Sequence, residues 1–373
     1  MRVGILTWYK ALNHGAALQA YASCKLLEEM GASPIMLDYK WNIEIDGTKY
    51  SRLFRYVKKF SFSQVRLHQI NKKWKREKKI VFDRFVNEML PVGKDYSIEE
   101  NLDAVYIGSD MVFDICQGYN AFMYGMGVHS NYIFSYAASF GYTTGEMLNE
   151  SNHRNDIVEA LNRLKAIGYR DRNTYEILAQ NGVSTPNFEC IDPVLCYGFN
   201  KELDLWDTGK WKDKRYILVY AYDSTMNESS TILQLKKIAN KENLIIVSCG
   251  YYHRWCDECV QASPQEFVEM VKHAYYVVTD TFHGTVFATI MHKRIAVIVR
   301  KNGFKLKYYL EQAGLLNCIS VLGNGMEQIL HQDIDYSAFN EWLLNQKTRS
   351  EEFIRQNLDK AMVLSKNVNN TPL

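Results

Sequence analysis

Short apolar runs alternate with amphipathic stretches along most of the chain. Such runs predict buried β-strands, and apolar residues three or four positions apart predict helices packed on one face. In the first half, the pattern predicts strands at 2–8, 34–38, 103–108, 132–138, 165–170 and 187–191, and helices at 15–30, 79–90, 153–163 and 172–181. Strands that alternate with helices are typical of a parallel sheet.

The alternation starts again after a polar stretch at 198–214, which we interpret as a linker. The second half predicts strands at 216–222, 244–248, 275–280 and 295–299, and helices at 228–241, 264–273, after His283, and at 304–313 and 336–366. We therefore expect an α/β protein of two Rossmann-type domains, with a cleft between them. The expected parts are an N-terminal domain at 1–200, a C-terminal domain at 215–330, and a helical segment at 331–373 that packs back.

Length and composition are compatible with this architecture. A chain of 373 residues with 47% hydrophobic residues can build two cores. The net charge of +2 gives no overall signature of nucleic-acid binding, so no nucleic-acid partner is expected. No apolar run is long enough to cross a membrane, and the N-terminus lacks the features of a secretion signal. With eight cysteines expected to be reduced, the predicted location is the cytoplasm.

Positive charge is concentrated in an insertion at 45–90. Residues 49–79 contain twelve Lys or Arg and a single acid, Glu77, so this segment carries +11. Aromatic residues are interleaved with the cations. The simpler interpretation is a helix with a solvated charged face. The functional alternative is a peripheral contact with anionic lipid or a phosphorylated lipid-linked substrate at the inner face of the membrane, with RNA binding a more remote third.

Ligands of open α/β sheets bind beyond the carboxyl ends of the strands, so polar residues there are candidates for binding. Asn13, His14 and Gly15 follow the first strand, where a glycine and a helix start suit a ligand as well as an ordinary turn. Ser109 and Asp110 follow a later strand. Asp110 could orient a sugar hydroxyl or cap the next helix.

Two further strand ends carry charged residues. Arg170 and Asp171 precede a helix, where a guanidinium beside the helix start suits an anion, with a surface salt bridge as the alternative. Asp192-Pro193 fits a hinge or turn as well as a ligand contact.

The segment around His283 is the sharpest candidate for catalysis. A histidine in the first turn of a helix has its cationic form disfavoured by the helix dipole, which suits a general acid or base. Gly284 leaves space for a ligand, and Thr281 and Thr285 flank the same turn as possible substrate contacts.

A zinc site is a competing interpretation of a different segment. Cys249, His253, Cys256 and Cys259 lie close together, but they include only one CxxC pair. We therefore favour a loop that faces the cleft and expect no metal.

These segments, taken in order, resemble the polysaccharide pyruvyltransferase family. The resemblance covers residue 1 to about 320 and is carried by the motifs at 13–22, 106–110, 135–141, 170–171, 192–193 and 279–285. It implies a GT-B-like fold and the transfer of pyruvate from phosphoenolpyruvate to two hydroxyls of a sugar, giving a cyclic ketal on capsule, exopolysaccharide or cell-wall glycans. It implies no cofactor beyond this donor substrate.

The resemblance also implies residue roles. His283 would donate a proton to the methylene carbon of phosphoenolpyruvate, and Arg170 would hold its carboxylate or phosphate. The helix starts at Gly15 and Gly284 could share the anionic charge.

One departure concerns the position two residues before the histidine, where many family members have an arginine and this chain has Thr281. Arg294, Arg300 and Lys305 are nearby cations that could replace it. Two other functions stay open. One is a GT-B glycosyltransferase that uses a nucleotide-sugar, with Glu266 or Asp280 as a ribose contact. The other is a non-catalytic, membrane-docked partner in glycan assembly.

Overall fold

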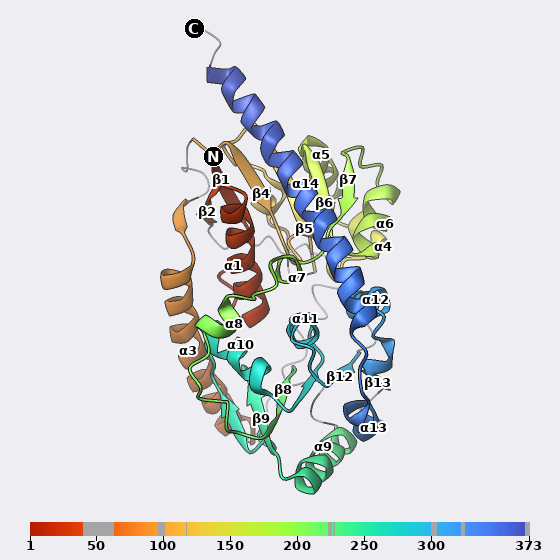
Figure 1. Cartoon of the computed structure of the whole chain (residues 1–373). Coiled ribbons are helices and arrows are strands. Elements are labelled where there is room, and N and C mark those ends of the chain that lie inside the picture. Colours follow the sequence, from red (N-terminus) through yellow and green to blue (C-terminus); the bar gives the residue numbers. More distant parts are fainter. Residues whose placement is uncertain are drawn as a thin grey trace.

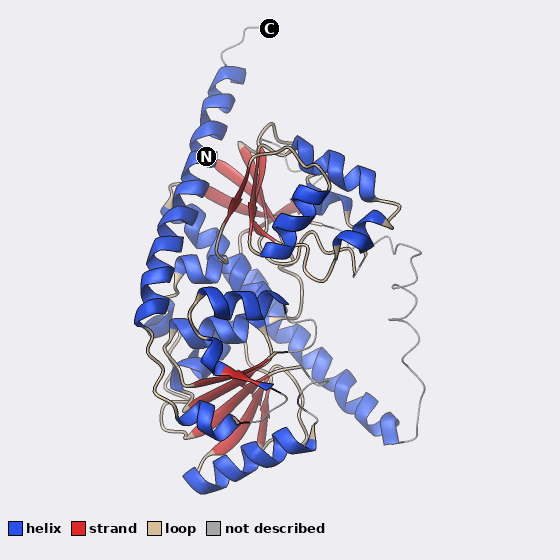
Figure 2. Ribbon diagram, turned by 90° about the vertical axis from the view of Figure 1, so that its right-hand side faces the viewer, coloured by secondary structure: helices blue, strands red, loops and turns tan. Residues whose placement is uncertain are grey.

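The computed structural model describes residues 1–39, 63–95, 101–116, 118–222, 226, 228–299, 304–321 and 325–369. Two β-sheets lie one above the other in these residues (Figures 1 and 2). The first has the strand order β3-β2-β1-β4-β5-β6-β7 and the second the order β10-β9-β8-β11-β12-β13. All neighbouring strands run parallel, as the alternation of strands and helices predicts.

The first sheet is built from the N-terminal half. Its strands are β1 (Arg2–Leu6), β2 (Ser33–Asp38), β3 (Val92–Asp95), β4 (Ala104–Ile107), β5 (Ile133–Ala138), β6 (Ala166–Tyr169) and β7 (Asn187–Glu189). Its helices are α1 (His14–Glu29), α3 (Ser63–Met89), the 3₁₀ turn η1 (Ala121–Tyr124), α4 (Gly145–Asn149), α5 (Arg154–Arg163), α6 (Arg172–Gln180), α7 (Pro193–Tyr197) and α8 (Glu202–Leu205).

The second sheet is built from the C-terminal half. Its strands are β8 (Tyr216–Tyr220), β9 (Ile245–Cys249), β10 (Glu258–Val260), β11 (Tyr276–Thr279), β12 (Ile295–Ile298) and β13 (Ile319–Ser320). The helices are α9 (Ser229–Glu242), α10 (Pro264–His273), α11 (Phe282–Ile290), α12 (Phe304–Gln312), the 3₁₀ turn η2 (Leu316–Cys318), α13 (Met326–His331) and α14 (Ser337–Asn369).

Burial explains why the strands could be read from the sequence. Every residue of β4, β8, β11 and β12 is buried. Parallel strands covered by helices on both faces are apolar along their whole length, and this gives the continuous runs seen in the sequence.

One apolar core extends across both halves, and a second, smaller cluster lies within the C-terminal half. Helix α1 packs against α7 of its own half and against α10 and α11 of the other. A single cluster of buried side chains runs from β1 through Phe199 to Phe267 and Phe287. The carboxyl ends of β4, β6 and β7 consequently lie opposite the end of β11.

The C-terminal helix α14 packs back across both halves, as expected (Figure 1). Near its start, the Trp342 ring lies 5.9 Å from that of Tyr309 in α12. Further along, Phe353 stacks on Phe188 at 5.7 Å, and the Ser350 hydroxyl accepts a hydrogen bond from the Ile191 N–H.

The prediction for the basic insertion was wrong in one respect. The helix predicted at 79–90 begins at Ser63, because its N-terminal part is so rich in charge that no apolar period is visible. Trp74, Lys78, Phe82 and Phe85 turn inward on one face of α3. Residues 49–62 lie outside the described part of the chain.

Helix α3 contacts both halves of the molecule. Phe85 lies 6.2 Å from Tyr21 of α1. On the other side, Lys78 Nζ donates a hydrogen bond to the Gly250 carbonyl at 2.9 Å, and the Trp74 carbonyl accepts one from Gln261 at 2.7 Å.

Smaller elements also escaped prediction. The edge strands β3, β10 and β13 have two to four residues each, too few to show a pattern. The stretch 198–214 contains the short helix α8 and the buried Trp211, so it is packed rather than an open linker. Within the described residues, no helix combines the length and apolarity needed to cross a membrane. All eight cysteines are free thiols.

Candidate functional site

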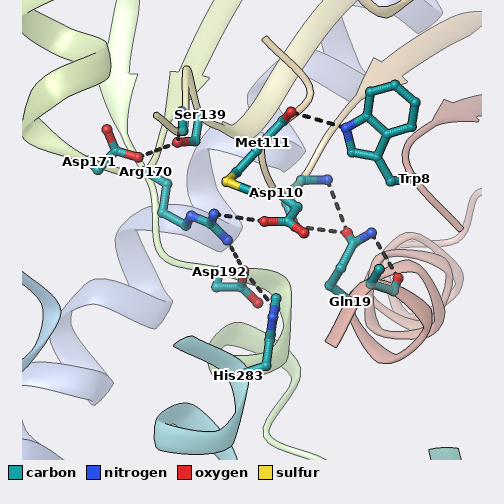
Figure 3. A network of polar contacts seen from close by, with 12 residues as sticks. Trp8, Gln19, Asp110, Met111, Ser139, Arg170, Asp171, Asp192 and His283 are labelled. Atoms are coloured by element: carbon teal, nitrogen blue, oxygen red, sulfur yellow. Dashed lines mark hydrogen bonds and ion pairs between the residues drawn. The ribbon is translucent and has the colours of Figure 1, made fainter. Parts of the chain in front are cut away.

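Four charged or polar side chains from both halves meet where the strands end (Figure 3). Asp110 follows β4, Arg170 follows β6, Asp192 follows β7, and His283 lies in the first turn of α11. Arg170 Nη1 lies 2.5 Å from Asp192 Oδ2, and Arg170 Nη2 lies 3.0 Å from Asp110 Oδ1. His283 Nε2 lies 3.4 Å from the same Asp192 Oδ2.

Arg170 is a buried cation rather than a surface residue. Its side chain is 4% exposed, and its two carboxylate partners neutralise its charge. The guanidinium also lies 4.6 Å above the Phe282 ring. The alternative of a surface salt bridge is therefore wrong.

The electrostatics of the two carboxylates reflect this pairing. Burial would raise the pKa of Asp110, but Arg170, Lys305 and His283 outweigh it and hold that pKa well below its usual range. Burial would likewise raise the pKa of Asp192, but His283 and Arg170 lower it. Both groups are therefore carboxylates at neutral pH.

His283 is held by its helix and by a glycine from the other half. Thr281 is the N-cap of α11, and its hydroxyl accepts a hydrogen bond from the Gly284 N–H at 3.0 Å. The imidazole lies against Gly15, where an added Cβ would be 2.1 Å from Nδ1. Only glycine at position 15 leaves room for this ring.

Asp110 is positioned by a buried network beneath it. Gln19 Oε1 accepts hydrogen bonds from the Ser109 N–H at 3.2 Å and from the Ser109 hydroxyl at 2.8 Å. The Thr7 hydroxyl donates to the Ser109 carbonyl at 3.1 Å. Asp110 itself has a positive φ of 74° and caps no helix, so the capping alternative is wrong.

Asp171 has a structural task beside Arg170. It is the N-cap of α6, with Oδ1 accepting from the Thr174 N–H at 2.9 Å. Its other oxygen accepts a hydrogen bond from the Ser139 hydroxyl at 2.5 Å. These contacts fix the backbone from which Arg170 projects.

A pocket opens beside Arg170 and contains a second cation. Its lining includes Arg170, Asp192, Phe282, Lys305 and, from α14, Trp342. Lys305 Nζ lies 5.7 Å from the Phe282 ring centroid and forms no hydrogen bond or ion pair with any described residue. Burial lowers the pKa of its ammonium group.

Other candidates lie beneath the site rather than in the pocket lining. The Asn13 side chain caps α1 by accepting a hydrogen bond from the Ala16 N–H. His14 is fully buried, with Nε2 3.0 Å from the Ala262 carbonyl oxygen, and burial lowers its pKa to about 3. The Thr285 hydroxyl donates to the Thr281 carbonyl. Asn13 thus caps a helix, His14 ties the two halves together, and Thr285 forms a hydrogen bond within the first turn of α11.

The cysteine segment forms no metal-binding cluster in the described residues. Cys259 Sγ donates to the His253 carbonyl, and His253 Nε2 lies 2.9 Å from the Ala221 carbonyl oxygen. Ligand-type atoms gather elsewhere, at Asp207, Glu269 and His273. There Lys272 Nζ lies 2.8 Å from Asp207 Oδ2, so this carboxylate already forms an ion pair with a protein cation.

Sequence reasoning thus predicted Arg170, Asp110 and His283 as site residues. It gave Asp192 only as a ligand contact or a hinge, and Lys305 only as one of three cations that could replace the missing arginine. The signal for Asp192 was present: an Asp-Pro pair after a strand is typical of a helix start, and Asp192 caps α7. Lys305 lies in a helix and not at a strand end, so the strand-end rule passes over it.

Two Rossmann-type domains that face each other across a polar site define the GT-B class of proteins. Solved structures share this fold. UDP-GlcNAc 2-epimerase from Neisseria meningitidis, bound to UDP-GlcNAc, matches with a TM-score of 0.56 and 9% identity over 96% of this chain and 100% of that one. The S. aureus MnaA–UDP structure matches with a TM-score of 0.51 and 14% identity over 98% and 96%.

The sequence itself assigns the family. The model of the polysaccharide pyruvyl transferase family matches residues 13–302, which include Asp110, Arg170, Asp192 and His283 but not Lys305. The chain belongs to this family and is therefore a transferase. No curated protein sequence matches it significantly.

Proposed function

We propose that the protein transfers pyruvate from phosphoenolpyruvate to two hydroxyls of a sugar, in a cell-surface polysaccharide such as a capsule or exopolysaccharide or in its precursor, forming a cyclic ketal. Family membership supports the transfer. The observation that carries the proposal is the meeting of His283, Asp192 and Arg170 beside a pocket that contains Lys305. His283 is not in the pocket lining itself but contacts Asp192, which is. A proton donor next to a pocket with a cation suits a substrate that must be protonated on carbon and bound as an anion.

The chemistry proceeds by protonation and two additions. His283 donates its proton to the methylene carbon of phosphoenolpyruvate, and C2 becomes an oxocarbenium-like centre. One sugar hydroxyl adds to C2 and loses its proton. Phosphate then leaves with its bonding electrons, and the second hydroxyl adds to C2, closes the ketal ring and releases the second proton. The donor supplies the phosphate leaving group, so the steps need no redox cofactor.

Lys305 is our candidate for the cation that holds the donor. Thr281, which occupies the position of the missing arginine, uses its hydroxyl to cap α11. Arg294 pairs with Asp333 on the surface, and Arg300 lies outside the described residues. Lys305 forms no hydrogen bond or ion pair in the described part of the chain, whereas Arg170 is compensated by two carboxylates. A carboxylate or phosphate would satisfy this ammonium group.

The alternatives have less support. Glu266 accepts hydrogen bonds from Lys210 and Trp211, and Asp280 Oδ1 accepts one from the Tyr222 N–H. Both carboxylates thus already accept hydrogen bonds from protein donors, and neither is among the residues that line the pocket beside Arg170. A non-catalytic role would make His283 dispensable.

The test is phosphate release from phosphoenolpyruvate with a panel of galactosides and N-acetylmannosaminides. We expect acceptor-dependent release by the wild type and none by His283→Ala. Equal release by the variant contradicts the proposal, and so does the absence of phosphoenolpyruvate binding to the wild type.

We further propose a cytoplasmic location with peripheral contact to anionic membrane through α3. Its described part exposes Lys73, Lys75, Arg76 and Lys79. The assay is cosedimentation with phosphatidylglycerol vesicles. Charge reversal at Lys75 and Arg76 should weaken binding at least tenfold, from roughly 1 kcal/mol per lost cation near the surface.

The matched control for the vesicle assay is the same charge reversal at Lys236 and Lys237, which are exposed on α9. Equal losses in both pairs would show that only net charge matters and would contradict a role for α3. Phosphatidylcholine vesicles, which carry no net charge, should not bind the wild type.

A further inference from the structure

The two oxygens of the Asp192 carboxylate have different contacts. One caps a helix, and the other faces Arg170 and His283 in the site. Oδ1 accepts a hydrogen bond from the Val194 N–H at 3.0 Å and thereby caps α7. Oδ2 lies between two groups, 2.5 Å from Arg170 Nη1 and 3.4 Å from His283 Nε2. The side chain is 0% exposed, so water cannot replace either contact.

The two nitrogens of His283 have different surroundings. Nε2 faces the Asp192 carboxylate, and it is buried without a hydrogen bond, because 3.4 Å is long for one. Catalytic hydrogen bonds are often long in an empty site and shorten when substrate binds. Nδ1 packs against the backbone of Gly15, where an added Cβ would lie 2.1 Å away, and no described residue forms a hydrogen bond with it.

We propose that Asp192 is a positioning residue for His283. Its Oδ2 accepts the Nε2–H, so Nδ1 is the nitrogen that delivers the proton to the substrate. This inference rests on the proposed function for the identity of the proton acceptor, but the orientation of the ring can be tested without it.

The proposed transfer balances. The Nδ1–H bond of the imidazolium breaks, a C–H bond forms at the methylene carbon, and the electron pair stays on Nδ1. The ring is then neutral, and its Nε2–H stays bonded to the Asp192 carboxylate. A proton released by a sugar hydroxyl restores the imidazolium. A carboxylate that holds one ring nitrogen fixes both the tautomer and the ring orientation.

The competing explanation is that Asp192 serves only to neutralise Arg170. Asp110 provides the control, because it also pairs with Arg170, at 3.0 Å, yet forms no hydrogen bond or ion pair with His283. Asp192→Asn and Asp110→Asn therefore remove the same charge from the same guanidinium. Only the first removes the partner of Nε2.

The experiment is a two-dimensional long-range ¹H–¹⁵N spectrum of histidine-labelled protein, with the His283 signals assigned from His283→Ala. We expect the neutral ring to carry its proton on Nε2 in the wild type and in Asp110→Asn. In Asp192→Asn the proton should move to Nδ1 or be shared between both nitrogens. A wild-type ring protonated on Nδ1, or an Asp192→Asn spectrum like the wild type, would overturn the proposal.

Kinetics give a second readout that a purely structural role would not produce. Asp192→Asn should lower kcat at least about 100-fold, as expected when an orienting carboxylate is lost, with a smaller change in KM for phosphoenolpyruvate. An unchanged kcat would contradict a positioning role. If the wild type itself does not turn over phosphoenolpyruvate, the proposed function fails, while the spectra still decide the orientation.

A second pair of variants covers the case in which Asp192→Asn does not fold. Arg170→Met removes the cation, and Arg170→Met with Asp192→Asn removes both charges of the pair. The His283 tautomer should differ between these two variants if Asp192 orients the ring. Identical spectra would overturn the proposal.

Discussion

Replacing Arg170 by methionine tests the electrostatic design of the site. The side chain is 4% exposed and has ion pairs with Asp192, which is 0% exposed, and Asp110, which is 16% exposed. Methionine fills a similar volume but leaves a buried carboxylate, Asp192, and a partly buried one, Asp110, without their cation. Removing one partner of a buried ion pair costs about 3–5 kcal/mol of unfolding free energy. For a domain of this size, that loss lowers Tm by roughly 6–20 °C.

The pH dependence of this loss has a definite sign. Arg170 contributes to holding the pKa of Asp110 and of Asp192 below the usual value, and burial acts in the opposite direction. A carboxyl group whose pKa is lower in the folded state stabilises the protein above its unfolded-state pKa of about 3.9. This stabilisation is lost as pH falls through the folded-state pKa. The difference in unfolding free energy between wild type and Arg170→Met should therefore be largest at neutral pH and should decrease in acid.

The assay is urea unfolding followed by circular dichroism at neutral pH and at the lowest pH where the wild type stays folded. Arg170→Lys is the control, because it keeps the charge but loses the two-pronged geometry, and it should lose less stability. A loss below about 1 kcal/mol for Arg170→Met, the level of a surface pair, would refute the reasoning. A difference in unfolding free energy that increases in acid would also refute it.

Three further predictions concern single residues. Lys305→Met should raise KM for phosphoenolpyruvate about tenfold or more, while Tm, followed by thermal melting, changes little, because Lys305 forms no hydrogen bond or ion pair with a described residue; a normal KM would remove Lys305 from donor binding. Thr281→Val should cost about 1 kcal/mol in urea unfolding by removing the cap of α11, and Thr281→Ser should not; equal stability of the two would contradict the capping role. Gly15→Ala should lower kcat about 100-fold, because its Cβ would lie 2.1 Å from His283 Nδ1 and must displace the ring; a wild-type rate would show that the ring position does not matter.

The fold was predictable where the residues of one strand or helix show by themselves which of its faces is buried. Fully buried strands such as β8 and β11 are apolar throughout, and their helices carry an apolar face, so the two-domain α/β architecture followed from the sequence. Helix α3 was harder, because its inward face includes Lys78, a charged residue at an apolar position. Short edge strands such as β10 have too few residues for any period.

The site was predictable only as far as backbone position determines it. Strand ends gave Arg170 and His283, but the same rule gave His14, whose ring points into the packing between the two halves. A backbone rule does not fix where a side chain points. The role of Asp192 arises from contacts with two residues distant in the sequence, and that of Lys305 from a helix packed beside the pocket. Such contacts exist only in the folded chain.

The most direct test of the proposed reaction is a mass spectrum of the sugar product formed from phosphoenolpyruvate in deuterated water. Protonation of the methylene carbon by an exchangeable donor predicts a pyruvyl ketal with one deuterium in its methyl group for the wild type, and no product for His283→Ala. A ketal formed at the wild-type rate by His283→Ala, or a wild-type product without deuterium, would contradict proton delivery by His283.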